Sequence, residues 1–143
     1  MSLLKKCIVE AIGTAFLTLF ACGVAVFSGA DIVATSLAFG LVIVVVAYTF
    51  GSISGCHINP AVSLAMWIKG EMTLKEMLAY MGAQVVGALV GSALLGVFLV
   101  NKLPFNVLGG NEIQYVLTSG SSGDLNAWSY IGAFIVEVLL TFV

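Results

Sequence analysis

The length of the stretches without charge constrains this chain more than any other feature. Two apolar runs of roughly 20 residues, about Cys7 to Ser28 and Ile32 to Phe50, lie near the N-terminus. A third run covers about Met77 to Val100, and a fourth begins near Ala127 and is still apolar at Val143. A helix of about 20 apolar residues spans a hydrocarbon core of about 30 Å. The pattern predicts three membrane-spanning helices and the start of a fourth.

Composition agrees with lipid, not water, as the solvent of this protein. Of the 143 residues, 61% are hydrophobic and 8% are charged, whereas a soluble domain carries about a quarter charged residues. A net charge of −2 without a basic stripe excludes a nucleic-acid partner. The three cysteines have no CxxC spacing and indicate neither a disulfide framework nor a zinc site. We therefore expect an all-α membrane protein with no metal and no cofactor.

The segment from Gly51 to Glu71 fits neither a spanning helix nor a solvated loop. Its first residues are too glycine-rich to continue the preceding helix, whereas Ile58 to Ile68 is too apolar for a loop in water. Asn59 followed by Pro60 indicates a helix start, because Asn caps and Pro at the first position loses only an unpaired N–H. A helix from Pro60 to Lys69 is about 15 Å long, half of a hydrocarbon core. We predict a re-entrant half-helix that begins near the midplane.

The lysines predict the orientation of this topology. Four of them fall on one side, and only one falls on the other, together with three acidic residues. Cytoplasmic loops carry the excess of Lys and Arg, so the N-terminus is expected in the cytoplasm and the protein in the plasma or inner membrane. The first set is Lys5, Lys6, Lys69 and Lys75; the second is Lys102 with Asp31, Glu112 and Asp124.

Two further patterns concern packing and repetition. Small residues recur on the third span and predict close helix packing, as is usual in lipid; they are Gly82, Ala83, Gly87, Ala88, Gly91 and Ser92. Ile8-Val9-Glu10 with Thr14 reappears as Ile135-Val136-Glu137 with Thr141, and internal repeats of this kind build many transport folds. We therefore expect a first repeat over residues 1–126 and the start of a second, truncated repeat over residues 127–143.

The start of the half-helix carries the chemistry. A helix N-terminus presents unpaired N–H groups and roughly half a positive charge, and the carbonyls of the four preceding residues, Gly55, Cys56, His57 and Ile58, form a row of acceptors. Irregular backbone at membrane depth either lines a watery cavity or is buried in protein, so a re-entrant segment without a pore is the alternative. If the segment lines a pore and the Asn59 side-chain oxygen caps the helix, the side-chain NH2 points into the pore. There the amide turns the hydrogens of each water away from it, which interrupts a proton wire, and the positive helix end repels cations. Neutral molecules are then expected to pass, and ions and protons are not.

The run Ser54-Gly55-Cys56-His57-Ile58-Asn59-Pro60-Ala61-Val62 resembles the first Asn-Pro-Ala loop of the aquaporin and glycerol-facilitator family, also called the major intrinsic proteins. The resemblance extends to the pairs or segments Glu10 to Thr14, Phe39-Gly40, Ala79-Tyr80, Ala83-Gln84 and Glu137 to Thr141. It implies an aquaporin-like helical bundle made of the first inverted repeat and the beginning of the second.

The resemblance also implies roles for individual residues. Asn59 donates to the permeating molecule, Pro60 and Ala61 lock the loop against its twin, and the carbonyls from Gly55 to Ile58 form a ladder for water. The carboxylates and the amide of Glu10, Glu137 and Gln84 brace the loops, and so does His57. Phe39 lines the narrowest part of the pore, where water channels of the family have Phe and glycerol facilitators usually have Trp.

We therefore expect a passive water channel in the complete protein, similar to bacterial water-selective members of the family. A facilitator of glycerol or another small neutral solute is one alternative, and a non-conducting scaffold of the same fold is another. No catalytic constellation supports an enzyme, because His57 and Cys56 are adjacent in one loop and adjacent residues rarely point at each other. The resemblance implies a homotetramer with one pore per subunit.

Overall fold

The computed structural model describes residues 1–29, 31–99 and 134. The chain divides into two compact units, Met1–Gly109 and Gly110–Val143. In the second unit only Phe134 is described, as a helical residue. The expected fourth span, the boundary at residue 126, the side of Lys102 and the role of Glu137 therefore lie outside the described residues.

The described part of the first unit is helical and contains no strand. Three continuous helical segments, Leu3–Phe27, Ile32–Ser54 and Leu74–Val97, are long and apolar enough to cross a membrane, which confirms the three predicted spans. The first of them is divided by a π-helical stretch. The elements are α1 (Leu3–Phe16), η1 (Leu17–Cys22), α2 (Gly23–Phe27), α3 (Ile32–Ser54), α4 (Pro60–Ile68) and α5 (Leu74–Leu99).

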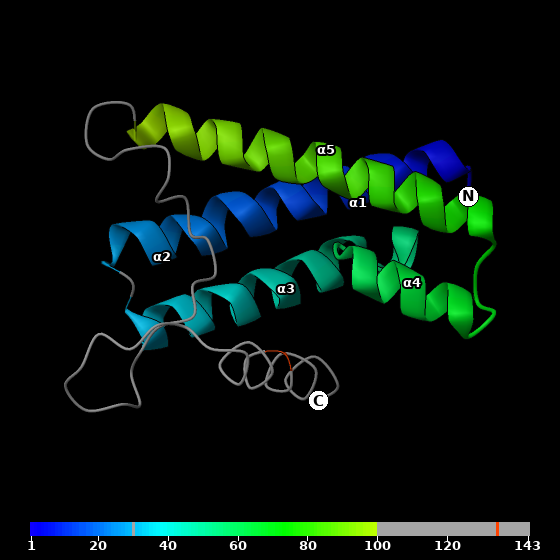
Figure 1. Cartoon of the computed structure of the whole chain (residues 1–143), viewed down its shortest axis with the longest axis horizontal. Coiled ribbons are helices and arrows are strands. Elements are labelled where there is room, and N and C mark those ends of the chain that lie inside the picture. The colour runs from blue at the N-terminus through cyan, green and yellow to red at the C-terminus, as the bar shows by residue number, and fades with distance from the viewer. Residues whose placement is uncertain (30, 100–133, 135–143) are drawn as a thin grey trace. The chain divides into compact units, whose positions relative to one another are not determined.

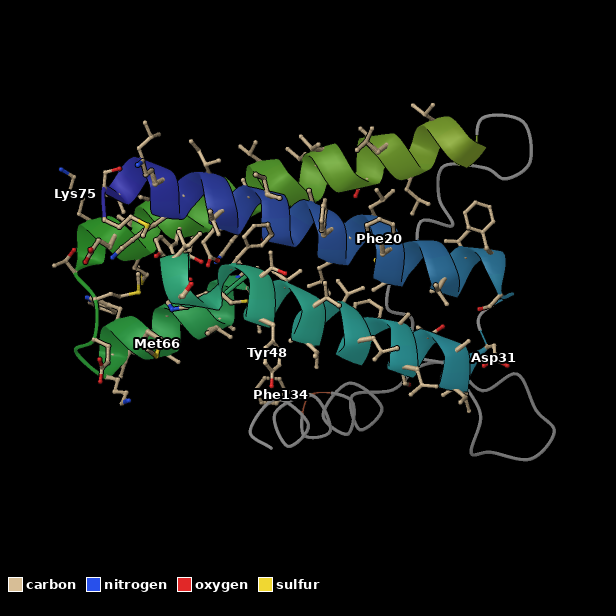
Figure 2. The ribbon with its side chains drawn as sticks, turned by 180° about the vertical axis from the view of Figure 1, so that it is seen from behind. Phe20, Asp31, Tyr48, Met66, Lys75 and Phe134 are labelled. Atoms are coloured by element: carbon tan, nitrogen blue, oxygen red, sulfur yellow. The ribbon has the colours of Figure 1, made fainter. Side chains whose placement is uncertain are left out.

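In this unit α5 lies along α1, and α3 packs against α1 and η1 (Figure 1). The short helix α4 runs toward the end of the unit where α1 and α5 begin. Figure 2 shows Lys75 and Met66 at this end and Asp31 at the other. The ammonium group of Lys6 lies 4.0 Å from the Glu76 carboxylate, also at this end. The basic residues before and after α4 thus share one end of the unit, as the re-entrant topology requires.

The second spanning helix is longer than the sequence indicated. We expected it to end at Phe50, but α3 continues through Gly51 to Ser54. Glycine and serine in sequence suggested a loop, yet the Gly51 carbonyl accepts a helical hydrogen bond from the Gly55 N–H at 2.9 Å. The helix stops one residue later, at Gly55, whose φ of +91° is a left-handed conformation that favours glycine.

Close packing of α5 is confirmed for two of its small residues. A Cβ added to Gly87 would lie 2.2 Å from the Ala11 carbonyl oxygen, and one added to Gly91 would lie 2.6 Å from the Ala15 oxygen. At these points the backbones of α1 and α5 touch, which only glycine permits. Gly82 differs, since a Cβ there would meet nothing within 4 Å among the described residues.

The π-helical stretch η1 was not expected. Two threonines bond back to the previous turn here: before η1 the Thr14 hydroxyl donates to the Glu10 carbonyl at 2.8 Å, and within η1 the Thr18 hydroxyl donates to the Thr14 carbonyl at 2.9 Å. Such bonds compete with the regular helical pattern and often bend helices. No apolar periodicity signals such a local change.

Candidate functional site

The turn between α3 and α4, residues 55–58, contains three residues with positive φ. After Gly55, Cys56 and Ile58 have φ of +54° and +42°. For residues other than glycine, such backbone costs on the order of 1–3 kcal/mol each and persists only where the surroundings hold it. Other groups must therefore hold the turn in this conformation.

Glu10 of α1 holds it. One carboxylate oxygen, Oε1, accepts a hydrogen bond from the Ser54 hydroxyl at 2.5 Å and from the His57 N–H at 3.0 Å. The other, Oε2, accepts from the Ile58 N–H at 2.6 Å and from the Gln84 amide at 2.9 Å. The side chain is fully buried. Four donors from three later segments converge on this carboxylate, and hydrogen bonds to a charged acceptor are the stronger kind.

Gln84 of α5 extends this cluster to α4. Its Nε2 donates to Glu10 and, at 3.1 Å, to the hydroxyl oxygen of Ser63. Its Oε1 is buried without a hydrogen-bond partner among the described residues. Turning the amide over would place Oε1 against the Glu10 carboxylate, so the donor side must face Glu10.

His57 and Tyr80 complete the support of the turn. The His57 ring nitrogen Nδ1 lies 3.0 Å from the Ser63 hydroxyl, and its ring packs edge-on to the Tyr80 ring with centroids 5.1 Å apart. The Tyr80 hydroxyl donates to the carbonyl of Ser54, the last residue of α3, at 2.8 Å. The turn, the half-helix α4 and the three spans are thus joined in one buried polar cluster.

The start of α4 has the predicted capping geometry. Asn59 is the N-cap, Pro60 is the first helical residue, and the Asn59 Oδ1 accepts a hydrogen bond from the Ala61 N–H at 2.8 Å. Because the oxygen caps the helix, the side-chain NH2 is free to donate elsewhere. All three residues are exposed at the surface of the described unit.

The peptide groups of the turn have two different environments. The N–H groups of Cys56, His57 and Ile58 point toward Ser54 and Glu10. Among the hydrogen bonds that the described residues form, none is accepted by the carbonyls from Gly55 to Ile58. The N–H groups of the turn are therefore bonded to α3 and α1, whereas its row of carbonyl oxygens can accept hydrogen bonds from other partners.

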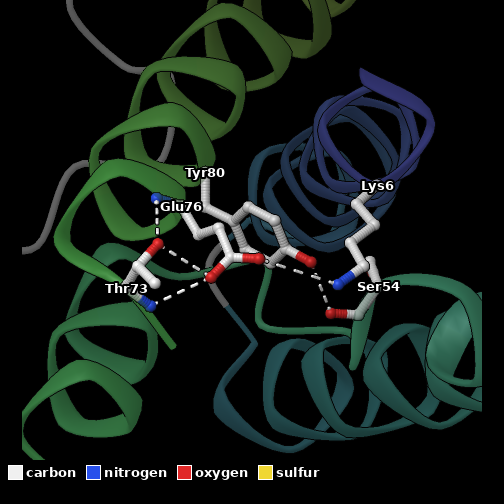
Figure 3. Close-up of polar contacts among 5 residues, drawn as sticks. All are labelled: Lys6, Ser54, Thr73, Glu76 and Tyr80. Atoms are coloured by element: carbon white, nitrogen blue, oxygen red, sulfur yellow. Dashed lines mark hydrogen bonds and ion pairs between the residues drawn. The ribbon is translucent and has the colours of Figure 1, made fainter. Parts of the chain in front are cut away.

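A cavity of about 190 Å³ lies beside this turn, at the lysine end of the unit. Figure 3 shows five residues around this region, where Glu76 accepts hydrogen bonds from the Thr73 N–H and hydroxyl, both at 2.9 Å. This bonding caps the start of α5, and the nearby Lys6 links it to α1. The walls of the cavity are formed by Lys6, Ser54, Gly55, His57, Met66, Glu71, Met72, Glu76 and Tyr80.

The structure brings most of the sequence-derived site residues together and shows others that we missed. Glu10, Gln84, His57 and the turn form one cluster, whereas Phe39 lies apart from it on α3, 36% exposed; its place in a pore stays a prediction. Among the described residues, no three His, Cys, Asp or Glu side chains gather as metal ligands would.

Three partners in the cluster were missed by the sequence analysis: Ser54, Ser63 and Tyr80. Tyr80 and Gln84 lie on the same buried stripe of α5 as Gly87 and Gly91, at helical spacings of three and four. The position of Tyr80 on the same helix face as Gln84 and the two glycines that contact α1 could have identified it. No comparable signal identified the two serines.

Comparisons with a family model and with individual proteins point to the same family. The whole chain, residues 1–143, matches the family described as major intrinsic protein. The chain is 35% identical over 143 residues to aquaporin Z of Rhodopseudomonas palustris, 37% over 144 to aquaporin Z of Bradyrhizobium diazoefficiens, and 34% over 147 to aquaporin Z of Brucella melitensis. These matches cover 96%, 96% and 97% of this chain but 58%, 58% and 61% of the relatives. The chain thus spans less than two thirds of the length of the curated relatives it matches.

Proposed function

The chain belongs to the major intrinsic protein family, and from that premise we propose that the complete protein is a passive water channel that excludes ions and protons. The observation that carries the proposal is that the Asn59 amide NH2 and the carbonyls of the preceding turn, neither of which is hydrogen-bonded among the described residues, lie next to each other in the chain. The amide donates and the carbonyls accept, so together they serve both ends of a water molecule.

The half-helix adds an electrostatic reason for selectivity. The N-terminus of α4 carries a partial positive charge that disfavours cations. A water molecule that accepts from the Asn59 amide must turn its hydrogens away from it, which interrupts a chain of proton-donating waters. Water is thus the proposed permeant. The three relatives named aquaporin Z support this choice over a non-conducting scaffold.

The experiment is osmotic swelling of vesicles that contain the full-length protein, with a pH-sensitive dye inside to report protons. We expect water permeability well above that of protein-free vesicles and no added proton leak. The variant Asn59→Asp keeps an oxygen to cap α4 but replaces the amide donor with a negative charge, so cation or proton leak should appear. Wild-type vesicles as slow as bare lipid would contradict the proposal.

Selectivity against glycerol is assigned to Phe39, on the resemblance alone. The bulk and the lack of hydrogen-bonding groups of its ring exclude a larger polar solute, so Phe39→Ala should raise the ratio of glycerol flux to water flux. Phe20→Ala, which removes an equally large exposed ring from η1, is the matched control and should leave the ratio unchanged. The same rise in both variants would remove Phe39 from the filter.

The proposed setting is the inner or plasma membrane, with the N-terminus in the cytoplasm and four subunits in the assembly. The lysines at the end where α1 and α5 begin support this orientation. Cross-linking of the full-length protein in its membrane tests the assembly, with a tetramer as the largest product expected.

A further inference from the structure

The cluster around Glu10 holds the turn and also sets the direction of the hydrogen bonds that reach the His57 ring. We propose that Ser63 holds His57 as the neutral imidazole with its proton on Nε2, so that the ring presents a fixed hydrogen-bond donor to water in the adjacent cavity. This deepens the proposed function, because it assigns a water-binding group outside the row of peptide carbonyls.

The first step is the orientation of the Gln84 amide. The Glu10 carboxylate offers only acceptors, and it lies 2.9 Å from the amide nitrogen of Gln84. The donor side of that amide therefore faces Glu10, and its second N–H reaches the Ser63 oxygen at 3.1 Å.

The second step is the direction of the Ser63 hydroxyl. Ser63 is fully buried, so water does not compete for its single proton. Its oxygen already accepts from Gln84, and the His57 Nδ1 at 3.0 Å is the acceptor within reach among the described residues. The hydroxyl proton therefore points to Nδ1, and Nδ1 must be the ring nitrogen without a proton.

The third step places the other ring nitrogen. A Cβ built on Gly55 would lie 3.3 Å from the His57 Nε2 and 3.4 Å from its neighbour Cδ2. This edge of the ring thus faces Gly55, and both residues line the cavity of about 190 Å³. A cavity of this size has room for several waters. Its wall also carries charged groups, Lys6, Glu71 and Glu76, with the Tyr80 hydroxyl engaged by Ser54.

The carboxylate is thus the start of a polarised chain. It runs from Glu10 through Gln84 and Ser63 to His57: the Gln84 amide donates both to Glu10 and to Ser63, and the Ser63 hydroxyl donates to the ring. A proton added at Nδ1 would make both neighbours of the Ser63 oxygen donors and leave its own hydroxyl without an acceptor. The arrangement favours the uncharged ring, which keeps a positive charge away from the water path.

Nitrogen-15 NMR of histidine in the full-length protein tests this inference. The His57 signals are identified by their loss in His57→Gln, and the shifts and proton couplings of the two ring nitrogens report the tautomer directly. We expect a protonated Nε2 and a bare Nδ1. Protonation at Nδ1, alone or together with Nε2, would overturn the proposal.

Two substitutions test the part played by Ser63. Ser63→Thr keeps the hydroxyl and should keep the wild-type tautomer, whereas Ser63→Ala should give a mixture of both neutral forms. An unchanged tautomer in folded Ser63→Ala would remove Ser63 as the cause. If that variant does not fold, the wild-type and Ser63→Thr spectra still decide the tautomer. The measurement does not depend on transport, so a protein without water flux would contradict the proposed function and leave the tautomer result intact.

Discussion

Replacing Glu10 with Gln tests whether a carboxylate is what holds the turn. Glutamine is nearly the same size, but one of its terminal atoms is an NH2 that cannot accept. Ser54 can rotate its hydroxyl, and Gln84 can turn toward the new amide its Oε1, which has no hydrogen-bond partner among the described residues. The N–H groups of His57 and Ile58 cannot turn, so one of them is left facing another donor.

These contacts set the expected size of the effect. A buried N–H without an acceptor costs about 2 kcal/mol, and two bonds that lose a charged acceptor weaken by about 1 kcal/mol each. The lower cost of burying an amide than a carboxylate offsets part of this sum. We expect Glu10→Gln to lower the free energy of unfolding by about 3 kcal/mol.

The assay is reversible denaturant unfolding of the full-length protein in detergent micelles, followed by tryptophan fluorescence. Glu76→Gln is the matched control, because Glu76 also accepts from a backbone N–H but is a third exposed, so water can replace the lost partner. Its loss of stability should be clearly smaller. Equal losses in the two variants, or a loss below about 1 kcal/mol for Glu10→Gln, would refute the reasoning.

Three other predictions follow from the packing and the topology. Gly87→Ala should destabilise the protein by about 1–3 kcal/mol in the same assay, because the new Cβ meets the Ala11 backbone, and Gly82→Ala, with open space, should not. In a cysteine-free protein, single cysteines at positions 5 and 70 should be labelled from the same side of the membrane; labelling from opposite sides would exclude the re-entrant segment. In the complete protein, with any cysteine outside residues 1–143 replaced, mercury should block water flux through Cys56; Cys56→Ser should abolish this block, and Cys7→Ser and Cys22→Ser should leave it in place.

The sequence predicts the elements whose causes are local. A span requires only about 20 apolar residues, and the start of α4 requires only the chemistry of Asn59 and Pro60, so both were found. The end of α3 was misplaced because Gly51 and Ser54 look like loop residues in isolation. Ser54 is bonded by Glu10, 44 positions earlier, and by Tyr80, 26 positions later, and long-range hydrogen bonds of this kind leave no local signal.

The same limit applies within the site. Glu10 and Gln84 were assigned to the loop by resemblance, but the four-donor arrangement and the part of Ser63 depend on three-dimensional placement. An ionisable residue in an apolar helix indicates function in general terms. It does not identify which later residues will surround it.

That order along the chain has a consequence for biosynthesis. Glu10 precedes its hydrogen-bonding partners by 44, 47, 48 and 74 positions. A charged side chain within an inserting helix costs up to about 3 kcal/mol, and when the first helix inserts, the later segments that carry these partners have not yet joined it in the bilayer. The first helix must therefore enter the bilayer at a disadvantage and wait for α5 before its carboxylate is fully paired. The buried cluster that holds the turn in the finished protein is therefore completed only when Gln84 of α5 reaches Glu10.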